Sequence, residues 1–236
     1  MISIGNFLFR FRNILFPLCF GLALVGRTPL LPSEWLAFAI GFAIAVSGQI
    51  LRALTIGLAY IKRGGKKRRI FAKGLVTDGI FAHCRNPLYL GNILIIIGVG
   101  IAINSFWFAV GGGIFFIFAY YAIVAAEENF LQEKFGNVYD EYCKDVNRFM
   151  PRLHGMASTI RSMKFHWKRL VVKEYGTTFS WFAGLCMIQL LKDRYLASGF
   201  HLHSDTGLLW GGLLFLAILL YGVARFLKKS RIIRAD

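Results

Sequence analysis

Long apolar runs dominate this chain and restrict what it can fold into. Hydrophobic residues make up 56% of the 236 residues, against about 45–50% in typical soluble domains. Six runs approach the roughly 20 residues that an α-helix needs to cross a bilayer: about 7–26, 35–60, 88–103, 106–125, 177–192 and 206–227. The pattern predicts an all-α fold, a multi-pass transmembrane helical bundle with about six spans.

The third and fourth runs are short and meet at Asn104 and Ser105. At about 1.5 Å per residue, one continuous helix over both runs would be far longer than the bilayer is thick. We therefore expect a short re-entering helical hairpin. Gly98, Gly100 and the run Gly111–Gly113 are expected to allow close helix approach there.

Basic residues are distributed unevenly between alternate loops. The chain has 28 Lys and Arg against 12 Asp and Glu, a formal net charge of +16. With six spans, every strongly basic loop falls on one side, and the opposite loops hold only Arg27, Lys192 and Arg194. The positive-inside rule then predicts an integral membrane protein with both termini cytoplasmic. We expect the membrane to be the bacterial inner membrane, or the endoplasmic reticulum in a eukaryotic cell.

The same charges bear on partners. In a soluble protein this excess would suggest nucleic acid, but here the charges flank apolar runs, where they orient the chain and contact anionic headgroups. The expected partner is the lipid bilayer and not nucleic acid; the oligomeric state stays open. His201, His203 and Asp205 lie in one short loop without a further spaced ligand, so no metal site is predicted.

One cation, Arg52, lies inside the second run, about one helical turn from Gln49. An intramembrane cation is costly and is often functional. Alternatively, its side chain could reach the interface near Tyr60. If it is functional, Arg52 is a candidate to guide a lipid-like acceptor, and Arg148 is the second candidate for binding the substrate.

Two polar segments, 73–91 and 127–153, flank the hairpin. Asn86 ends an irregular stretch of the first, because a proline disfavours helix at the residue before it, and Pro87 suits the first turn of the following helix. Free N–H groups at that helix start, together with the charge of Arg85, favour a carboxylate or a phosphate.

In the second segment, Glu127 and Glu128 follow the fourth run. A carboxylate on a buried face needs a partner, which for Glu127 could be a ligand amine or hydroxyl, or alternatively Arg85 or Arg148. If the helix continues past Gly136, Glu127 shares one face with four more residues at helical spacing: Leu131, Phe135, Val138 and Tyr142.

These elements occur in a recognisable order: Gly74–Thr77, Gly79, Phe81, Arg85-Asn86-Pro87, Tyr89, Gly91, Glu127-Glu128, Phe135-Gly136, Tyr139, Tyr142 and Pro151. The order resembles the isoprenylcysteine carboxyl methyltransferase family, integral-membrane methyltransferases related to phospholipid N-methyltransferases. The chain departs from that pattern at Asn86, where histidine is usual, and at Ile123, where eukaryotic members have an arginine thought to handle the substrate.

The resemblance implies an S-adenosylmethionine-dependent methyltransferase with a cytoplasmic cofactor pocket. It would transfer the methyl group directly to a lipid, prenylated or otherwise lipid-modified acceptor, by carboxyl O-methylation or amine N-methylation. The candidate catalytic residues are Arg85, Glu127 and Glu128. A carboxylate acceptor needs no base, whereas an amine acceptor must lose a proton, for which Glu128 is the nearest candidate by position. The residues that the resemblance implies for cofactor binding are Lys73, Gly74, Leu75, Val76, Phe81, Asn86, Pro87, Leu88, Tyr89 and Glu127.

Two alternatives remain at this point: an NADPH-dependent membrane reductase of the sterol type, and a non-enzymatic transporter or scaffold. The expected organisation is an N-terminal two-span unit (1–61), a methyltransferase core (62–153), and a basic linker with a C-terminal two-span unit (154–236).

Overall fold

The computed structural model describes residues 1–24, 28–59, 63–66, 69–72, 74–196 and 205–234. It confirms an all-α bundle. The elements, in order, are α1 (Ile2–Cys19), η1 (Phe20–Leu24), α2 (Glu34–Leu58), β1 (Arg63–Lys66), β2 (Arg69–Ala72), η2 (Gly79–Ala82), α3 (Pro87–Ala102), η3 (Trp107–Gly112), α4 (Gly113–Phe135), α5 (Asn137–Asp145), α6 (Met156–Ser162), α7 (Trp167–Leu196) and α8 (Asp205–Lys229).

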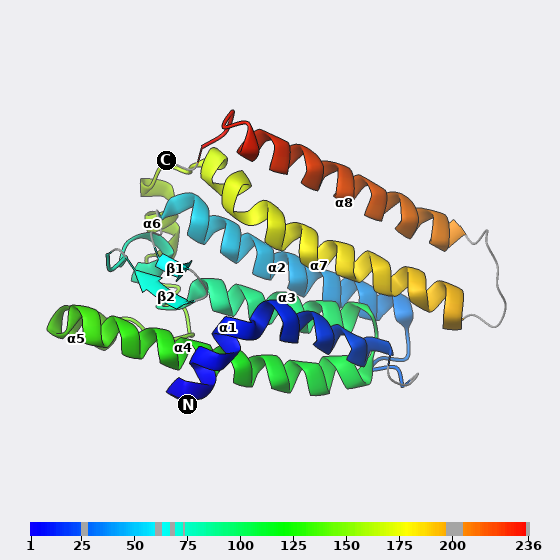
Figure 1. Cartoon of the computed structure of the whole chain (residues 1–236). Helices are drawn as coiled ribbons and strands as arrows, with labels where there is room; N and C mark the ends of the chain where they lie inside the picture. The colour runs from blue at the N-terminus through cyan, green and yellow to red at the C-terminus, as the bar shows by residue number, and fades with distance from the viewer. Residues whose placement is uncertain (25–27, 60–62, 67–68, 73, 197–204, 235–236) are drawn as a thin grey trace.

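The long helices lie side by side with their axes roughly aligned (Figure 1): α1, α2, α3, α4, α7 and α8. α2 packs mainly against α3, α7 against α8, and α1 against α4. The strands β1 and β2 form a small antiparallel hairpin in which Arg63 is opposite Ala72. This hairpin, α5, α6 and both termini lie at one end of the bundle (Figure 1).

Three stretches of helix within the described residues are long and apolar enough to cross a membrane: Glu34–Leu58, Trp107–Phe135 and Thr206–Lys229. A fourth apolar helix, Pro87–Ala102, is shorter. The protein is therefore a membrane protein, and the count of six spans stays a prediction.

The boundaries of two expected spans were wrong. The first helix ends at Cys19, after Pro17, and the chain continues as the 3₁₀ turn η1. The fifth begins at Trp167, ten residues before the expected position, because the basic stretch before the apolar run is itself helical. Lysine and arginine are good helix formers, so their charge does not end a helix.

The expected turn between the third and fourth runs is present and is held by Asn104. This residue has a positive φ of 49°. Its Oδ1 accepts hydrogen bonds from the backbone N–H groups of Leu30 and Leu31 at 2.9 and 2.8 Å, and its Nδ2 donates to Glu34 Oε1 at 3.0 Å. The turn is thereby tied to the connection between α1 and α2.

Glycines bring α2 and α3 into backbone contact, but not the glycines in the expected run. A Cβ on Gly48 would lie 2.6 Å from the carbonyl oxygen of Gly91, and one on Gly98 would lie 2.6 Å from that of Gly41. By contrast, a Cβ on Gly111 or Gly113 would meet nothing within 4 Å. The prediction for that run was wrong: Gly111 and Gly112 belong instead to the π-helical turn η3.

The helix that carries the paired glutamates stops where a continuation was considered. Gly136 has φ 53° and separates α4 from α5. Because the helix axis is broken there, Val138 does not continue the face of Glu127, and its side chain is 66% exposed. Leu131 and Tyr139 remain buried, together with Ala72, in a small cluster beside the β-hairpin.

Candidate functional site

The corner before α3 has the predicted form. Pro87 occupies the first turn of α3, and Asn86 precedes it with non-helical dihedral angles. The Asn86 side chain does not cap the helix. Instead its Nδ2 donates to Glu128 Oε1 at 3.0 Å and to the Arg148 carbonyl at 3.3 Å. Two segments far apart in the sequence therefore meet at this residue.

Glu128 is the carboxylate that holds this corner together. Arg85 Nε lies 3.3 Å from Glu128 Oε1, and Arg148 Nη2 lies 2.6 Å from Glu128 Oε2. The alternative considered for Glu127, an ion pair with Arg85 or Arg148, is wrong because both arginines pair with Glu128. Both oxygens of Glu128 are engaged, so its geometry suits fixing the corner better than touching an acceptor.

Burial affects two groups of this corner. It lowers the pKa of the Arg148 guanidinium, but the facing carboxylate of Glu128 outweighs burial and leaves that pKa raised. The Arg148 charge is therefore retained. Cys84, which is fully buried, has a pKa raised by its burial, and its Sγ lies 3.5 Å from the Phe149 carbonyl oxygen.

Glu127 has different surroundings. Its Oε1 accepts a hydrogen bond of 2.8 Å from the hydroxyl of Tyr89, in the first turn of α3. The Glu127 side chain is buried. The ring of Tyr89 lies 5.5 Å from that of Tyr120, which is about two helical turns before Glu127 on α4. A carboxylate and two aromatic rings thus lie together between α3 and α4.

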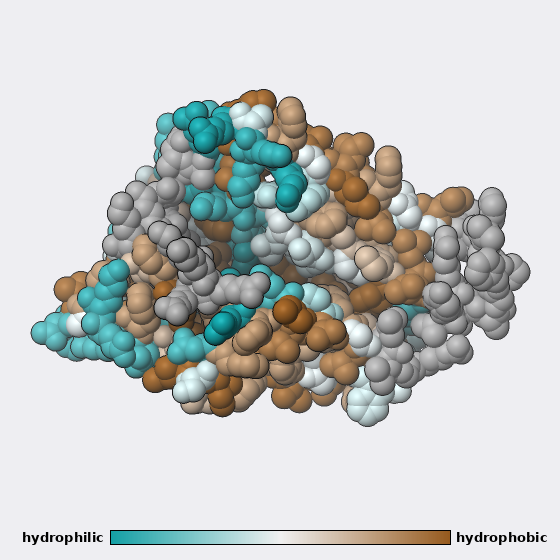
Figure 2. Space-filling view, in the orientation of Figure 1, coloured by the Kyte–Doolittle hydropathy of each residue, from teal (hydrophilic) through white to brown (hydrophobic). Residues whose placement is uncertain are grey.

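These residues border a cavity of about 890 Å³, here called the central cavity. Four of the residues expected to bind a cofactor line it: Asn86, Leu88, Tyr89 and Glu127. α1, α2, α7 and α8 supply the other walls. Figure 2 shows the surface hollowed beside the hydrophilic end of the molecule, with hydrophilic residues lining the recess.

Other predicted residues lie elsewhere. Gly74–Val76 form an irregular segment after β2, and Leu75 packs against the Leu131 cluster. Phe81 was expected to offer its ring to the cofactor, but the ring is fully buried and does not line the central cavity. The Phe81 carbonyl instead accepts the Tyr142 hydroxyl at 2.7 Å. Lys73 lies outside the described residues.

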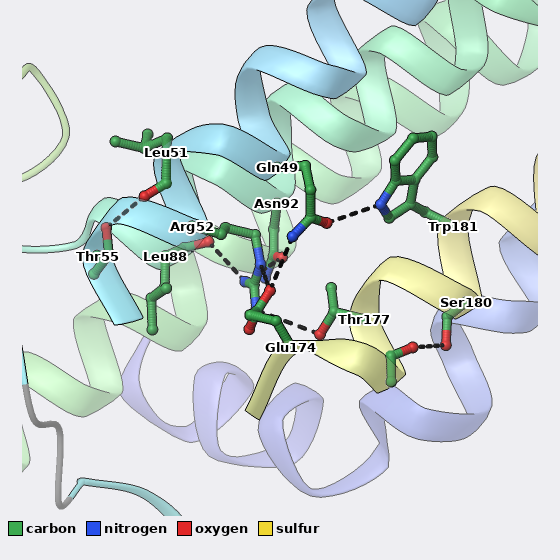
Figure 3. A network of polar contacts seen from close by, with 11 residues as sticks. Gln49, Leu51, Arg52, Thr55, Leu88, Asn92, Glu174, Thr177, Ser180 and Trp181 are labelled. Carbon is green, nitrogen blue, oxygen red and sulfur yellow. Dashed lines mark hydrogen bonds and ion pairs between the residues drawn. The ribbon is translucent and has the colours of Figure 1, made fainter. Parts of the chain in front are cut away.

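Arg52 does not reach toward the interface, as one alternative held. It is buried, and its Nη2 and Nε lie 2.6 and 2.9 Å from the two carboxylate oxygens of Glu174 on α7 (Figure 3). Its Nη1 donates to the Leu88 carbonyl at 3.2 Å and to Asn92 Oδ1 at 2.7 Å. Arg52 also lines the central cavity. It therefore connects α7 to the first turns of α3.

Glu174 was missed by sequence reasoning. Gln49 Nε2 donates to it at 3.3 Å, and Trp181 Nε1 donates to Gln49 Oε1 at 2.9 Å (Figure 3). A signal existed, since Glu174 is an acidic residue just before an apolar run and Arg52 needed a buried partner. The signal is weak because Glu174 lies at the end of a basic stretch, a composition that is typical of a linker.

No group of three His, Cys, Asp or Glu that could hold a metal ion occurs in the described part of the chain. His201 and His203 lie outside it.

Comparison with known proteins agrees with this geometry. Residues 35–138 match the phospholipid methyltransferase family. The chain is 31% identical over 114 residues to the nickel-cobalt-cadmium resistance protein NccN of Alcaligenes xylosoxydans xylosoxydans, covering 48% of this chain and 48% of that protein. It is 32% identical over 114 residues to the cobalt-zinc-cadmium resistance protein CzcN of Cupriavidus metallidurans, covering 48% and 47%.

The matched stretch thus spans about half the length of each of these two relatives. No solved structure matches the chain. The family match begins near the start of α2 and ends in α5, so it includes the Asn86 corner, both glutamates and Arg52, but not α7 and α8. The match of residues 35–138 to the phospholipid methyltransferase family, a family of integral-membrane methyltransferases, confirms the resemblance deduced from the motifs.

Proposed function

We propose that this protein is an S-adenosylmethionine-dependent methyltransferase of the membrane that acts on a lipid or lipid-modified acceptor. One observation carries the proposal. Asn86 and Tyr89 at the start of α3 and Glu127 near the end of α4 border the same cavity, and all three lie in the stretch that matches the methyltransferase family.

The residues of the central cavity fit the chemical groups of that cofactor. The volume of about 890 Å³ is within the range of small-molecule sites, about 300–1,000 Å³. The first-turn N–H groups of α3 have no partner within the helix and suit a carboxylate. The Glu127 carboxylate and the rings of Tyr89 and Tyr120 suit an ammonium and a sulfonium. S-adenosylmethionine carries all three groups.

The residues divide the work between binding and positioning. Bound S-adenosylmethionine would supply a methyl group that its sulfonium has already activated. Tyr89 orients Glu127 through the 2.8 Å hydrogen bond. The start of α3 is held in place by Asn86, which lines the cavity, and by Arg85 and Glu128, which do not. Alignment and exclusion of water then account for the rate.

The acceptor determines whether a proton must be removed. A carboxylate acceptor carries none, whereas an amine must lose one before it can form the new bond. Among the described residues lining the central cavity, Glu127 is the single carboxylate. If the acceptor is an amine, Glu127 is therefore better placed to take the proton than Glu128, the candidate favoured by sequence position.

The proposal includes six spans with both termini cytoplasmic. The start of α1 and the end of α8 lie at the same end of the bundle (Figure 1), and the basic loops of the sequence fall on one side of the expected spans, which supports it. Fusing a reporter that is active only in the cytoplasm to either terminus should give active fusions, and a fusion within residues 197–204 should be inactive. The reverse pattern would contradict the proposed orientation.

A methyl-transfer assay tests the activity itself. Purified protein, radiolabelled S-adenosylmethionine and a total membrane extract should yield label in a lipid or in a lipid-modified protein. Glu127→Gln should lower transfer strongly, whereas Glu133→Gln, on the exposed face of the same helix, should not. NADPH should not compete with the cofactor in a thermal-shift assay. Competition by NADPH, or no label in any fraction, would overturn the proposal.

A further inference from the structure

A second cavity lies on the other side of the wall that α7 and α8 contribute to the central cavity. It has a volume of about 580 Å³ and is here called the α7–α8 groove. Its α8 side is entirely hydrocarbon in the middle of the helix: Leu213, Leu216, Ala217 and Leu220. Leu216 and Leu220 are 50% and 58% exposed, so the groove opens to the outside of the bundle, on a helix that is long and apolar enough to cross a membrane.

Three aromatic residues line both the groove and the central cavity: Tyr175, Phe179 and Tyr221. Their rings are in contact, with centroids 5.3 Å apart between Tyr175 and Tyr221 and 4.5 Å apart between Phe179 and Tyr221. The Arg52–Glu174 pair lies across the same boundary, because Arg52 lines the cavity and Glu174 lines the groove. A polar and an apolar compartment thus share one wall.

The polar side of this wall is basic. Arg12, Lys173 and Lys228 all line the central cavity, from three different helices. Within the described residues, none of the three forms an ion pair with a carboxylate. Lys228 instead donates to the Val172 carbonyl at 3.2 Å and lies 5.0 Å from the centre of the Tyr175 ring. These cations are available to an anionic group beside the aromatic wall.

We propose that the acceptor is a membrane lipid with an anionic headgroup, and that α7 and α8 form its binding site. The headgroup lies in the central cavity at Lys173 and Lys228, and one hydrocarbon chain passes over Tyr221 into the α7–α8 groove. The assignment rests on the proposed methyl transfer and extends it to two helices outside the segment that matches the family. The groove's apolar lining matches a hydrocarbon chain and offers no partner to a polar headgroup in the middle of α8.

Photolabelling tests the chain site without any methyl donor. The protein is placed in lipid nanodiscs with phosphatidylglycerol that carries a diazirine in one acyl chain, used as an anionic binding probe and not as a methyl acceptor, and adducts are mapped by mass spectrometry after irradiation. Adducts should concentrate on Leu213, Ala217 and Leu220 rather than on Phe215 and Leu219, which are exposed and lie outside the groove. Equal labelling around α8 would overturn the proposal.

Two variants sharpen the test. Ala217→Trp fills the groove and should remove most of the labelling there, because the indole ring occupies the space of the chain. Leu219→Trp places the same ring on the outer face of α8 and should leave labelling unchanged. An unchanged melting temperature shows that Ala217→Trp still folds. If that variant is unstable, the mapping of adducts on the unmodified protein decides alone.

The headgroup is tested with a matched zwitterionic probe. Phosphatidylcholine with the same diazirine chain should label the groove less than phosphatidylglycerol does, and Lys173→Gln with Lys228→Gln should abolish the difference. Equal labelling by both probes would overturn the anionic headgroup. Because labelling needs no cofactor, a failed methyl-transfer assay would refute the proposed function while leaving the lipid site standing, and the converse also holds.

Discussion

Arg52 and Glu174 form a bidentate ion pair between α2 and α7, with Nη2–Oε1 and Nε–Oε2 distances of 2.6 and 2.9 Å. Their side chains are 9% and 4% exposed. The pair connects the segment that matches the methyltransferase family to a helix beyond it. Through the Arg52 bond to the Leu88 carbonyl, it also positions the start of α3, where the cofactor is proposed to bind.

Removing one partner of this pair should destabilise the fold strongly. Glu174→Ala leaves the Arg52 guanidinium buried without its carboxylate, which costs about 3–5 kcal/mol. The melting temperature in detergent should fall accordingly. The double variant Arg52→Met with Glu174→Leu removes both charges and should recover most of the loss. A double variant as unstable as the single one would show that the pair acts through more than its charge.

Asn86→Asp should damage the corner before α3. The change replaces the amide that donates to Glu128 Oε1 at 3.0 Å with a second carboxylate, and leaves the lost hydrogen bond uncompensated. We expect a cost on the order of 2 kcal/mol in stability and a weaker affinity for S-adenosylmethionine. Thermal unfolding and cofactor titration measure the two effects.

Asn129→Asp is the matched control for that variant. Asn129 Nδ2 donates to Glu133 Oε1 at 2.7 Å on the exposed side of α4, the helix that also carries Glu128. The substitution therefore also places a new carboxylate opposite a glutamate, but on a surface exposed to water. Interactions between exposed charges change the stability by less than about 1 kcal/mol. Equal effects of the two substitutions would show that burial of the Asn86–Glu128 pair is unimportant.

The fold could be predicted largely because apolar runs and the charges between them impose a bundle. The turn at Asn104 followed from helix length alone. The long-range contact of the Asn86 corner with the glutamates was also predicted, because an ordered set of motifs marked both segments. Which glutamate met which arginine was not predictable. Glu127 and Glu128 are adjacent in sequence, and only the rotation of α4 decides that Glu128 faces Arg85 while Glu127 faces Tyr89.

The contribution of α7 could not be predicted for a different reason. Glu174 has no motif around it, and its role arises only from the packing of α7 beside α2 and α3. The inward direction of the Phe81 ring could not be predicted, because an aromatic residue in a motif does not reveal which way its ring points. The ring turns into the core while the backbone carbonyl bonds with Tyr142.

Close packing of α2 on α3 should make Gly48 intolerant of even one methyl group. A Cβ there would lie 2.6 Å from the Gly91 carbonyl oxygen, which is backbone and cannot move alone. Gly48→Ala should therefore lower the free energy of unfolding by about 1–3 kcal/mol, although alanine favours helix. Gly212→Ala in α8, where nothing lies within 4 Å of the new Cβ, should be neutral or stabilising. Thermal unfolding in detergent compares the two variants.

Cys84 should resist alkylation in the folded protein. Its side chain is fully buried, and burial raises its pKa, so little thiolate forms near neutral pH. Cys143 in α5 is partly exposed and serves as an internal control. Mass spectrometry after treatment with iodoacetamide at pH 8 should find label on Cys143 and little on Cys84 until the protein is denatured. Rapid labelling of Cys84 in the native state would contradict the packing of the corner.

Tyr89→Phe isolates the hydrogen bond that orients Glu127. The substitution keeps the ring beside Tyr120 and removes only the hydroxyl that donates to Glu127 Oε1 at 2.8 Å. A hydrogen bond to a charged group contributes about 1.5 kcal/mol or more, so the Kd for S-adenosylmethionine should rise about tenfold. Tyr121→Phe, which lies outside the central cavity, should leave the Kd unchanged. If the two variants bind the cofactor equally well, Glu127 does not need Tyr89, and the cavity wall between α3 and α4 cannot be what holds the cofactor.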